Sequence, residues 1–471
     1  MRIYLLGIAG TGMGSVAGLL RKAGHEVCGS DENVYPPMSD KLAEWGIETF
    51  TPYAASNLAK SFGGRGPELC IVGNVIRAEN AEAREVRRHG YAHLSFPEAL
   101  DELFLGQRHS VVIVGTHGKT TTTSLMAAVL HSAGRDPSLL VGGVPLDFNE
   151  GFRLGKGQHF VLEGDEYDTA YFDKGPKFLH YRPRTAIFTG AEFDHADIYR
   201  DMAHYESAFA RFVPLLPADG YLAACSTFDN WKKIVEPAKC KVETYSATKA
   251  DADWTARGLT LGPDGAKFEV VYRNAIESKM VLNAAGRHNV ENALGVYAAC
   301  RALGLTAGEI GRGFASFKGV KRRQELRGVV KGVRVIDDFA HHPTAVRETI
   351  AAVAAQHPGQ RLIAVFEPRS NTAMRKIHQD EYAHAFTGAA EAIISQPTAI
   401  AKVPEADRVD AKKMAAEIAA SGTPCRWMES PDAIVAALAA EAKDGDVVLA
   451  MSNGAFGNLH KKLLAALEAR T

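Results

Sequence analysis

A short strand that runs directly into a glycine-rich loop constrains this chain more than any other feature. Four aliphatic residues at 111–114 predict the strand, and the sequence Gly-Thr-His-Gly-Lys-Thr-Thr at 115–121 then opens a helix. Backbone N–H groups of such a loop, together with the positive end of the helix, bind phosphate. The glycines are two residues closer than in the general phosphate-loop pattern, so a plain turn with an incidental lysine is the alternative. The order strand, loop, helix favours a nucleoside triphosphate site.

The residue types of this loop fit such a ligand. Lys119 would reach the β- and γ-phosphates, and the Thr120 hydroxyl would bind Mg²⁺. We expect the Lys119 side chain to be exposed until nucleotide binds. The predicted triphosphate-binding residues are Gly115, Thr116, His117, Gly118, Lys119, Thr120 and Thr121.

Length and composition limit the classes of function. A chain of 471 residues predicts about three domains. The 54 Lys and Arg residues balance 55 Asp and Glu residues, so no basic field is available for nucleic acid. The six cysteines form no Cys-x-x-Cys pair, which is typical of reduced thiols in the cytosol. No apolar run approaches the roughly 20 residues that cross a bilayer, and no signal peptide precedes the first strand, so we expect a cytoplasmic protein without membrane insertion.

Alternating strands and helices predict three α/β segments, at 1–107, 108–320 and 321–471. The first segment begins with a strand at 2–6, a glycine-rich turn at 7–14, a helix through Lys22 and a strand ending at Asp31. This order predicts a parallel doubly wound sheet. The turn and Asp31 favour a dinucleotide or another nucleotide diphosphate about equally with a plain tight turn. Asn74, after a further strand at 69–72, could face the same crevice.

Polar clusters follow two predicted strands of the second segment. The strand at 159–162 leads into acidic residues at 163–168, of which Glu163 is best placed for Mg²⁺; a solvated acidic turn is the alternative. The strand at 185–189 leads to His195, which could ligate a metal or be an ordinary loop histidine. Asn289 and Asn292 share one face of a predicted helix and could pair with adenine, or one of them could cap the helix.

The third segment also carries polar clusters after its strands, which we predict at 333–336, 362–366, 392–394 and 447–450. Asp337-Asp338 and His341-His342 indicate a site more than a core. The basic run at 321–323 could be solvated or could bind phosphate. Arg369 and Arg375, beside a Ser and an Asn, would suit a substrate carboxylate, with surface ion pairing as the alternative.

Set in this order, the motifs resemble those of the Mur ligases, the ATP-dependent amide-forming enzymes of peptidoglycan synthesis. The resemblance covers essentially the whole chain and is carried by residues 7–14, 115–121, 163–166, 194–195, 286–292, 322–323 and 337–343. Within the family, the chain most resembles the branch that acts on UDP-N-acetylmuramate. Residues 163–170, 180–183 and 367–372 are similar to the enzymes of that branch that add a recycled tripeptide rather than L-alanine. Residues 207–212 contain no lysine, whereas other Mur ligases carry a carbamylated lysine in this region.

The resemblance implies three domains: an N-terminal Rossmann-like UDP-binding domain, a central P-loop ATPase-like domain and a C-terminal Rossmann-like domain. It also implies phosphoryl transfer from ATP, with Mg²⁺, to the lactyl carboxylate of UDP-N-acetylmuramate. The amine of L-alanyl-γ-D-glutamyl-meso-diaminopimelate would then attack the acyl phosphate, in peptidoglycan recycling.

The resemblance further implies roles for individual residues. The catalytic residues would be Lys119, Glu163 and His195, and the metal ligands Thr120, Glu163 and His195. The remaining ATP contacts would be Asn289, Asn292, Arg323 and Asp338. The UDP-sugar contacts would be Gly10, Gly12, Gly14, Asp31 and Asn74, and the peptide contacts His341, Arg369, Ser370, Asn371 and Arg375.

Three other functions are weighed against this one. The nearest is a UDP-N-acetylmuramate–L-alanine ligase. An NAD-dependent oxidoreductase, suggested by residues 7–14 and Asp31, leaves the phosphate loop and the third segment without a role. A non-catalytic nucleotide switch does not account for polar clusters at so many strand ends. The sequence predicts no oligomeric state.

Overall fold

The computed structural model describes residues 1–470, and the chain divides into two compact units. Unit 1 contains Met1–Ala191, Glu206–Tyr245 and Gly295–Gly313. Unit 2 contains Glu192–Tyr205, Ser246–Leu294 and the chain from Phe314 onward. These units do not coincide with the three predicted segments, whose boundaries stay predictions.

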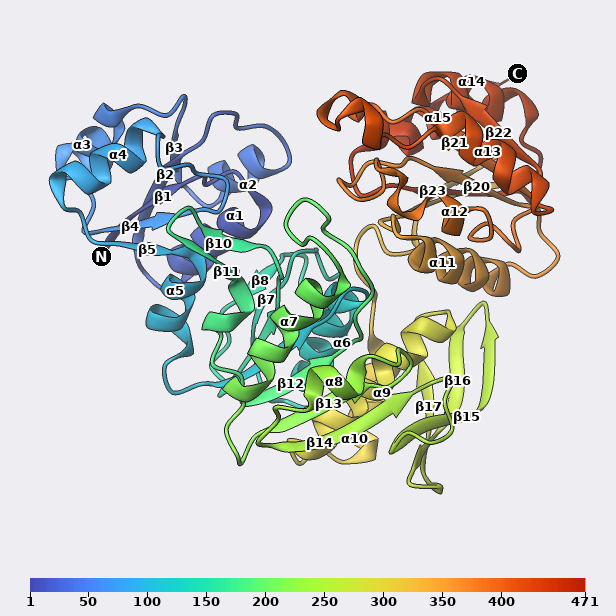
Figure 1. The fold of residues 1–471 in the computed structure, drawn as a ribbon, viewed down its shortest axis with the longest axis horizontal. Helices are drawn as coiled ribbons and strands as arrows, with labels where there is room; N and C mark the ends of the chain where they lie inside the picture. The colour runs from blue at the N-terminus through green and yellow to red at the C-terminus, as the bar shows by residue number, and fades with distance from the viewer. Residues whose placement is uncertain (471) are drawn as a thin grey trace. The chain divides into compact units, whose positions relative to one another are not determined.

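The first sheet of unit 1 is a parallel five-stranded sheet in the order β3-β2-β1-β4-β5 (Figure 1). Its central strand β1 has four consecutive fully buried residues, as expected of a strand covered on both faces. The strands are β1 Arg2–Leu6, β2 Glu26–Ser30, β3 Glu48–Phe50, β4 Leu69–Val72 and β5 His93–Ser95. The helices are α1 Thr11–Lys22, α2 Met38–Glu44, α3 Ala55–Gly64, α4 Ala81–His89 and α5 Phe96–Leu100.

The second sheet of unit 1 has β6 at its centre, between β9 and β12. Its strands run in the order β8-β7-β9-β6-β12-β13-β14, and only β8 is antiparallel to its neighbour. The strands are β6 His109–Val114, β7 Ser138–Leu140, β8 Phe152–Arg153, β9 His159–Glu163, β12 Thr185–Phe188, β13 Tyr221–Cys225 and β14 Lys241–Ser246. A hairpin of β10 Asp168–Ala170 and β11 Asp173–Pro176 follows β9.

Five α-helices, α6 to α10, lie between residues 119 and 316. The long helix α6 Lys119–Ser132 follows β6 directly. The others are α7 Met202–Phe212, α8 Trp231–Val235, α9 Arg287–Ala302 and α10 Ala307–Ser316. In unit 2, β15 Trp254–Gly262, β16 Gly265–Tyr272 and β17 Ala275–Leu282 form an antiparallel meander (Figure 1).

The C-terminal sheet of unit 2 has six strands in the order β18-β19-β23-β20-β21-β22. Only β18 is antiparallel to its neighbour. The strands are β18 Glu325–Val330, β19 Val333–Asp338, β20 Leu362–Phe366, β21 Glu391–Ser395, β22 Cys425–Met428 and β23 Val447–Met451. The helices are α11 Pro343–Gln356, α12 Gln379–Tyr382, α13 Ala411–Ala420, α14 Pro431–Glu441 and α15 Leu459–Glu468.

Helices cover both faces of this sheet, because the strands are apolar on both sides. Successive residues of β20 alternate between two cores. One core contains Phe366 together with residues of α11, α12 and α13. The other contains Val365 together with residues of α14 and α15. The predicted α/β class with parallel sheets is therefore confirmed.

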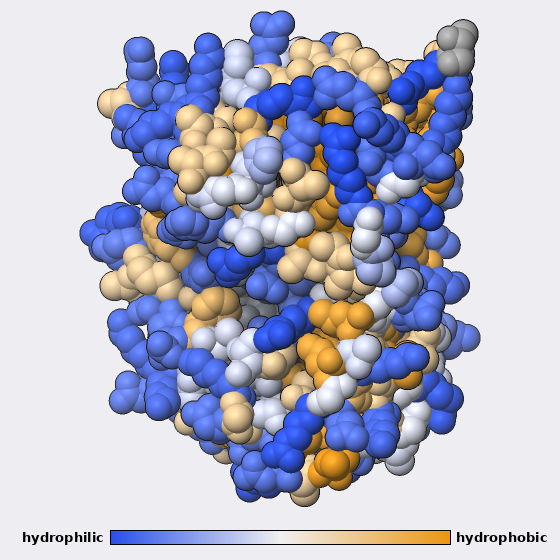
Figure 2. Space-filling model, turned by 90° about the vertical axis from the view of Figure 1, so that its right-hand side faces the viewer, coloured by the Kyte–Doolittle hydropathy of each residue, from blue (hydrophilic) through white to orange (hydrophobic). Residues whose placement is uncertain are grey.

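The surface is largely hydrophilic on the face that Figure 2 shows, with apolar side chains between the polar ones. Within residues 1–470, no helix has the length and apolar character that a membrane span requires.

Candidate functional site

The phosphate loop has the strand–loop–helix geometry that the sequence predicts. β6 ends at Val114, and α6 begins at Lys119. Gly115 has φ +135°, and a Cβ there would lie 2.3 Å from the Thr189 Oγ1 atom, so only glycine fits. The Thr189 hydroxyl donates a hydrogen bond to the His117 carbonyl at 2.6 Å. The end of β12 thus fixes the loop that follows β6.

Lys119 is not the exposed side chain that we expected. Its side chain is 13% exposed, and its Nζ atom lies 2.8 Å from Glu166 Oε1. Nζ also donates to the carbonyls of Gly115 at 2.6 Å and Thr116 at 3.1 Å. Burial alone would lower the pKa of Lys119, but the Glu166 carboxylate raises that pKa above its ordinary value. Lys119 is buried because the turn after β9 places the buried Glu166 carboxylate beside it.

Thr120 and Glu163 form the second polar contact of this loop. The Thr120 hydroxyl donates to Glu163 Oε1 at 2.8 Å, and the Gly142 N–H donates to Oε2 at 2.7 Å. Glu163 is the last residue of β9, next to β6, so neighbouring strand ends bring the two side chains together. Glu166 is 1% exposed, which excludes a fully solvated acidic turn.

The predicted UDP-sugar residues lie at the carboxyl ends of β1, β2 and β4 in unit 1. Gly10 and Gly12 are exposed, and so is Asn74. Gly14 is buried, and a Cβ there would lie 2.3 Å from the Met38 sulfur. Packing against Met38 is therefore a sufficient reason for glycine at position 14.

Asp31 stabilises the glycine-rich turn directly. One carboxylate oxygen accepts from the Ala9 N–H at 2.9 Å, and the other accepts from the Tyr53 hydroxyl at 3.3 Å. A ribose-binding role remains a prediction.

In unit 2, three separate stretches of the sequence meet at Asp194. The carboxylate of Asp194 accepts from the His195 N–H at 2.7 Å, and its Oδ2 lies 3.5 Å from the His341 Nε2 atom. Burial would raise the pKa of Asp194, but the hydrogen bond from His341 and the charges of both histidines hold it well below its ordinary range. The Ala196 N–H donates to the Thr372 hydroxyl at 3.3 Å. His195 and His341, predicted from different motifs, thus share one carboxylate.

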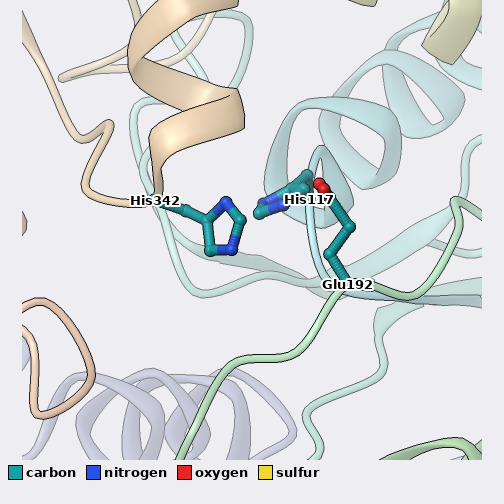
Figure 3. A group of neighbouring side chains, drawn as sticks. All are labelled: His117, Glu192 and His342. Carbon is teal, nitrogen blue, oxygen red and sulfur yellow. The ribbon is translucent and has the colours of Figure 1, made fainter. Parts of the chain in front are cut away.

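Glu192 and His342 belong to the same part of unit 2. His342 is one of the paired histidines that indicated a site, whereas Glu192 was not predicted as a site residue. Glu192 follows β12, and His342 is the N-cap of α11 (Figure 3). The Thr344 hydroxyl, in the first turn of α11, donates to Glu192 at 3.0 Å. Figure 3 also labels His117, which belongs to the phosphate loop of unit 1. The one sequence signal for Glu192 was its place two residues before the Asp194-His195 motif.

The two asparagines of α9 lie together, as their spacing predicts. Both are 8% exposed, and the Asn292 amide donates to Asn289 Oδ1 at 3.5 Å. Asn289 lies inside the first turn of α9 and donates to the Ala285 carbonyl at 2.6 Å, so it is not the helix cap.

Asp338 and Arg323 lie near Phe339 in unit 2. Asp338 is 4% exposed and accepts from the N–H groups of Gln324 at 2.8 Å and Ala340 at 2.7 Å. Burial raises the pKa of Asp338, and Arg323 opposes that shift. The Arg323 guanidinium stacks over the Phe339 ring, 4.6 Å from its centroid.

The predicted peptide-binding residues after β20 differ in their surroundings. The Ser370 hydroxyl accepts from the Ala373 N–H at 3.0 Å, and the Asn371 amide donates to Asp197 at 3.0 Å. Arg375 forms an ion pair with Asp407 at 3.1 Å, which is the alternative that we named for it. Arg369 is 39% exposed and lies 3.7 Å from the buried carboxylate of Glu367.

Most of the chain matches descriptions of one protein family. Three family descriptions match consecutive parts of the chain: "Mur ligase family, catalytic domain" at 2–108, "Mur ligase middle domain" at 113–300 and "Mur ligase, glutamate ligase domain" at 322–454.

Individual relatives match over the whole length. An Escherichia coli (strain K12) enzyme named UDP-N-acetylmuramate–L-alanyl-γ-D-glutamyl-meso-2,6-diaminoheptandioate ligase is 39% identical over 99% of this chain and 98% of its own. A UDP-N-acetylmuramate–L-alanine ligase of Clostridium tetani is 31% identical over 96% of this chain and 95% of its own. The crystal structure of a murein peptide ligase from Psychrobacter arcticus is 35% identical, with a TM-score of 0.73, over 100% of this chain and 99% of its own. The predicted three-domain α/β fold is confirmed.

Proposed function

The chain belongs to the Mur ligase family of ATP-dependent ligases, and we propose that it joins UDP-N-acetylmuramate to L-alanyl-γ-D-glutamyl-meso-diaminopimelate. The new amide links the lactyl carboxylate to the N-terminal amine of the tripeptide. The observation that carries the proposal is the 39% identity to the E. coli enzyme of that name over 99% of this chain. The C. tetani relative, 31% identical, makes L-alanine the alternative acceptor.

The proposed chemistry has two steps. A carboxylate is a poor electrophile, so its oxygen first attacks the γ-phosphorus of ATP, and ADP leaves. The amine nitrogen then attacks the acyl carbon, phosphate leaves with the electron pair of the broken C–O bond, and the nitrogen loses a proton. The first step brings two anions together and therefore requires positive charge at the phosphoryl group.

Lys119 supplies this charge in the proposal. Its ammonium is held by the loop carbonyls of Gly115 and Thr116, and its raised pKa keeps it protonated. The exposed residues Gly10, Gly12 and Asn74 would contact the UDP-sugar.

The oxygen donors beside the loop fit Mg²⁺. The Thr120 hydroxyl and the Glu163 carboxylate lie 2.8 Å apart at neighbouring strand ends, and hard oxygen ligands are those that Mg²⁺ prefers. Mg²⁺ held there would neutralise phosphate charge. His195 would hold a second ion, Asn289 and Asn292 would contact adenine, and Arg323 and Asp338 would contact the rest of ATP.

Labelled oxygen tests the proposal directly. With ¹⁸O in the lactyl carboxylate, the released phosphate should carry one ¹⁸O atom per amide formed, because that oxygen becomes the bridge of the acyl phosphate. Phosphate without ¹⁸O would refute the acyl phosphate. Amide formation with L-alanine but not with the tripeptide would refute the proposed acceptor.

A further inference from the structure

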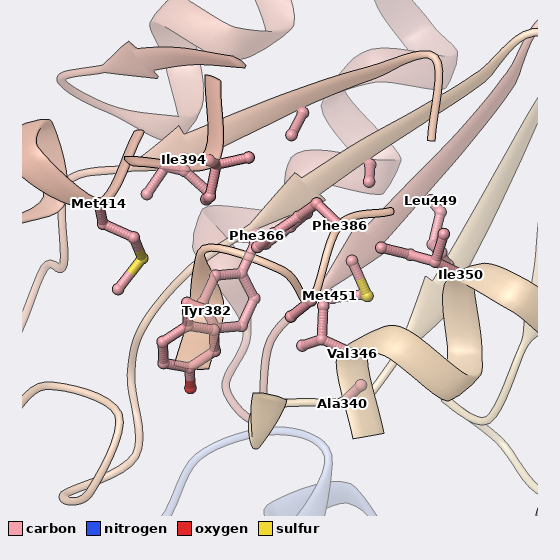
Figure 4. Packing of buried hydrophobic residues seen from close by; sticks show 14 of the residues in the cluster. Ala340, Val346, Ile350, Phe366, Tyr382, Phe386, Ile394, Met414, Leu449 and Met451 are labelled. Atoms are coloured by element: carbon pink, nitrogen blue, oxygen red, sulfur yellow. The ribbon is translucent and has the colours of Figure 1, made fainter. Parts of the chain in front are cut away.

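Three strand ends of the C-terminal sheet meet at one buried carboxylate, that of Glu367. Glu367 follows β20 directly and is 0% exposed. Its Oε2 accepts from the Ser452 hydroxyl at 2.7 Å, and its Oε1 accepts from the Thr398 hydroxyl at 3.0 Å. Phe366 and Met451, which precede Glu367 and Ser452, pack in the core drawn in Figure 4. The carboxylate therefore lies where the carboxyl ends of β20, β21 and β23 converge, the edge at which open α/β sheets bind ligands.

The charged neighbour of this carboxylate is Arg369. Arg369 Nη1 lies 3.7 Å from Glu367 Oε1 and donates to the Thr398 hydroxyl at 3.4 Å. The arginine lies across Gly454, because a Cβ at that position would be 1.9 Å from its Nε atom. Arg322 fixes the same backbone by donating to the carbonyls of Ser452 and Gly454, each at 2.6 Å. The guanidinium is thus held in one place by a carboxylate, a hydroxyl and a glycine surface.

Most of the donors of Arg369 remain available. Its Nε and Nη2 atoms make no hydrogen bond to any part of residues 1–470, and the side chain is 39% exposed. A guanidinium with two adjacent unused N–H groups pairs with a planar carboxylate through two parallel hydrogen bonds. An exposed arginine without a fixed neighbour would first have to lose its rotamer freedom.

We propose that Glu367 is a positioning residue that fixes Arg369 as the receptor for a carboxylate of the acceptor peptide. This inference rests on the proposed function, since the tripeptide carries free carboxylates beyond its N-terminal alanine. The Glu367 carboxylate touches no substrate. It compensates part of the Arg369 charge and directs the free N–H groups outward.

A purely structural role for Glu367 makes a different prediction. If Glu367 only joined three strand ends, its replacement would lower thermal stability and would change kcat/KM for all acceptors by the same factor. Positioning Arg369 affects one property selectively, namely the preference for an acceptor with a free carboxylate over the same peptide with that group amidated.

The test compares the tripeptide with tripeptides amidated at single carboxylates, using the full-length enzyme with ATP and UDP-N-acetylmuramate. For the unmodified protein, kcat/KM should fall by about 10- to 100-fold for at least one amide, the usual range for a charged hydrogen-bonded pair. In Glu367→Gln and in Arg369→Ala, the same amide should be discriminated by less than about 3-fold. The KM for ATP should be unchanged in both variants.

Two further variants make the test decisive. Gly454→Ala displaces Arg369 without altering Glu367 and should also abolish the discrimination, even if Glu367→Gln does not fold. Glu391→Gln is the matched control, because Glu391 pairs with Arg361 at 2.9 Å at the opposite end of β21 and should keep the full discrimination.

Each other outcome overturns a specific claim. If the unmodified protein uses every amide as well as the free tripeptide, Arg369 binds no carboxylate. If Glu367→Gln folds and discriminates like the unmodified protein, Glu367 has no positioning role. If the unmodified protein accepts L-alanine but not the tripeptide, the proposed function fails, and this inference with it.

Discussion

At the scale of single residues, the Lys119 ammonium is bound by the Glu166 carboxylate and by two carbonyls of its own loop. Its partner Glu166 is 1% exposed, so each charge depends on the other. Removing one member of a buried ion pair costs roughly 3–5 kcal/mol, because the remaining charge is desolvated and unpaired. The same substitution can therefore affect both catalysis and stability.

Lys119→Ala should abolish ligation and also lower Tm, which phosphate release and calorimetry would measure. Lys119→Met combined with Glu166→Gln removes both charges, so it should recover most of the lost Tm but none of the activity. Lys233→Ala is the control, since Lys233 pairs with Glu206 but is 67% exposed. An active Lys119→Ala variant, or a double variant that is both stable and active, would contradict the role of Lys119.

Asp337 makes stability depend on pH. Burial raises its pKa from 3.8 to about 6, although Arg322 opposes this shift. Between these values Asp337 binds more protons in the folded state than in the unfolded state, so its contribution to stability falls as pH rises from about 4 to about 6. The full shift corresponds to roughly 3 kcal/mol at most.

Asp337→Asn should therefore raise Tm relative to the unmodified protein at pH 7.5, and the gain should shrink toward pH 4. Calorimetry of both proteins across this range would measure the difference. A Tm difference that is constant with pH would show that Asp337 does not titrate there.

At the scale of elements, the β6–α6 connection depends on a glycine that nothing else can replace. Gly115 combines φ +135° with a Cβ position 2.3 Å from Thr189 Oγ1 and 2.8 Å from the Gly190 carbonyl. Both neighbours belong to the segment after β12, so a larger residue at 115 would separate two adjacent strand ends.

Gly115→Ala should lower the affinity for ATP more than 10-fold and reduce Tm, because the loop must move away from β12. Gly134→Ala is the matched control: Gly134 also has positive φ, +74°, but a Cβ there meets nothing within 4 Å. It should cost only about 1 kcal/mol of stability and leave ATP affinity unchanged. Equal effects of the two substitutions on ATP binding would contradict the steric explanation.

Local sequence patterns predicted fewer than half of the strands in the described residues, mostly central strands of the parallel sheets, and they did not predict the polar partners of these strands. The strands at 2–6 and 362–366 were predicted to the residue, because consecutive apolar side chains and a following turn define them. The burial of Lys119 could not be predicted, since it depends on how the chain turns after β9. The strands β15–β17 were not predicted either, because many residues of β15 and β17 are exposed and the apolar pattern is weak.

The candidate site was predictable in part for the same reason. Polar residues directly after strands, such as Glu163 and Asn74, follow from the rule that ligands lie at carboxyl ends of parallel strands. The contacts of Asp194 with His341, and of Ala196 with Thr372, join segments more than a hundred residues apart. Glu367 was overlooked because a buried carboxylate next to a proline resembles an ordinary loop residue.

At the scale of the whole molecule, three successive family matches, at 2–108, 113–300 and 322–454, include most of the chain. The activation of a carboxylate by ATP is common to the family, whereas the acceptor distinguishes its members. The central claim is therefore the identity of the acceptor.

A competition between the two acceptors tests this claim most directly. The protein is incubated with ATP, UDP-N-acetylmuramate and equal concentrations of L-alanine and L-alanyl-γ-D-glutamyl-meso-diaminopimelate, and both products are quantified by mass spectrometry. We predict that the tripeptide product exceeds the alanine product by at least about 100-fold, a difference of roughly 3 kcal/mol in transition-state stabilisation. A predominant UDP-N-acetylmuramoyl-L-alanine product would contradict the account.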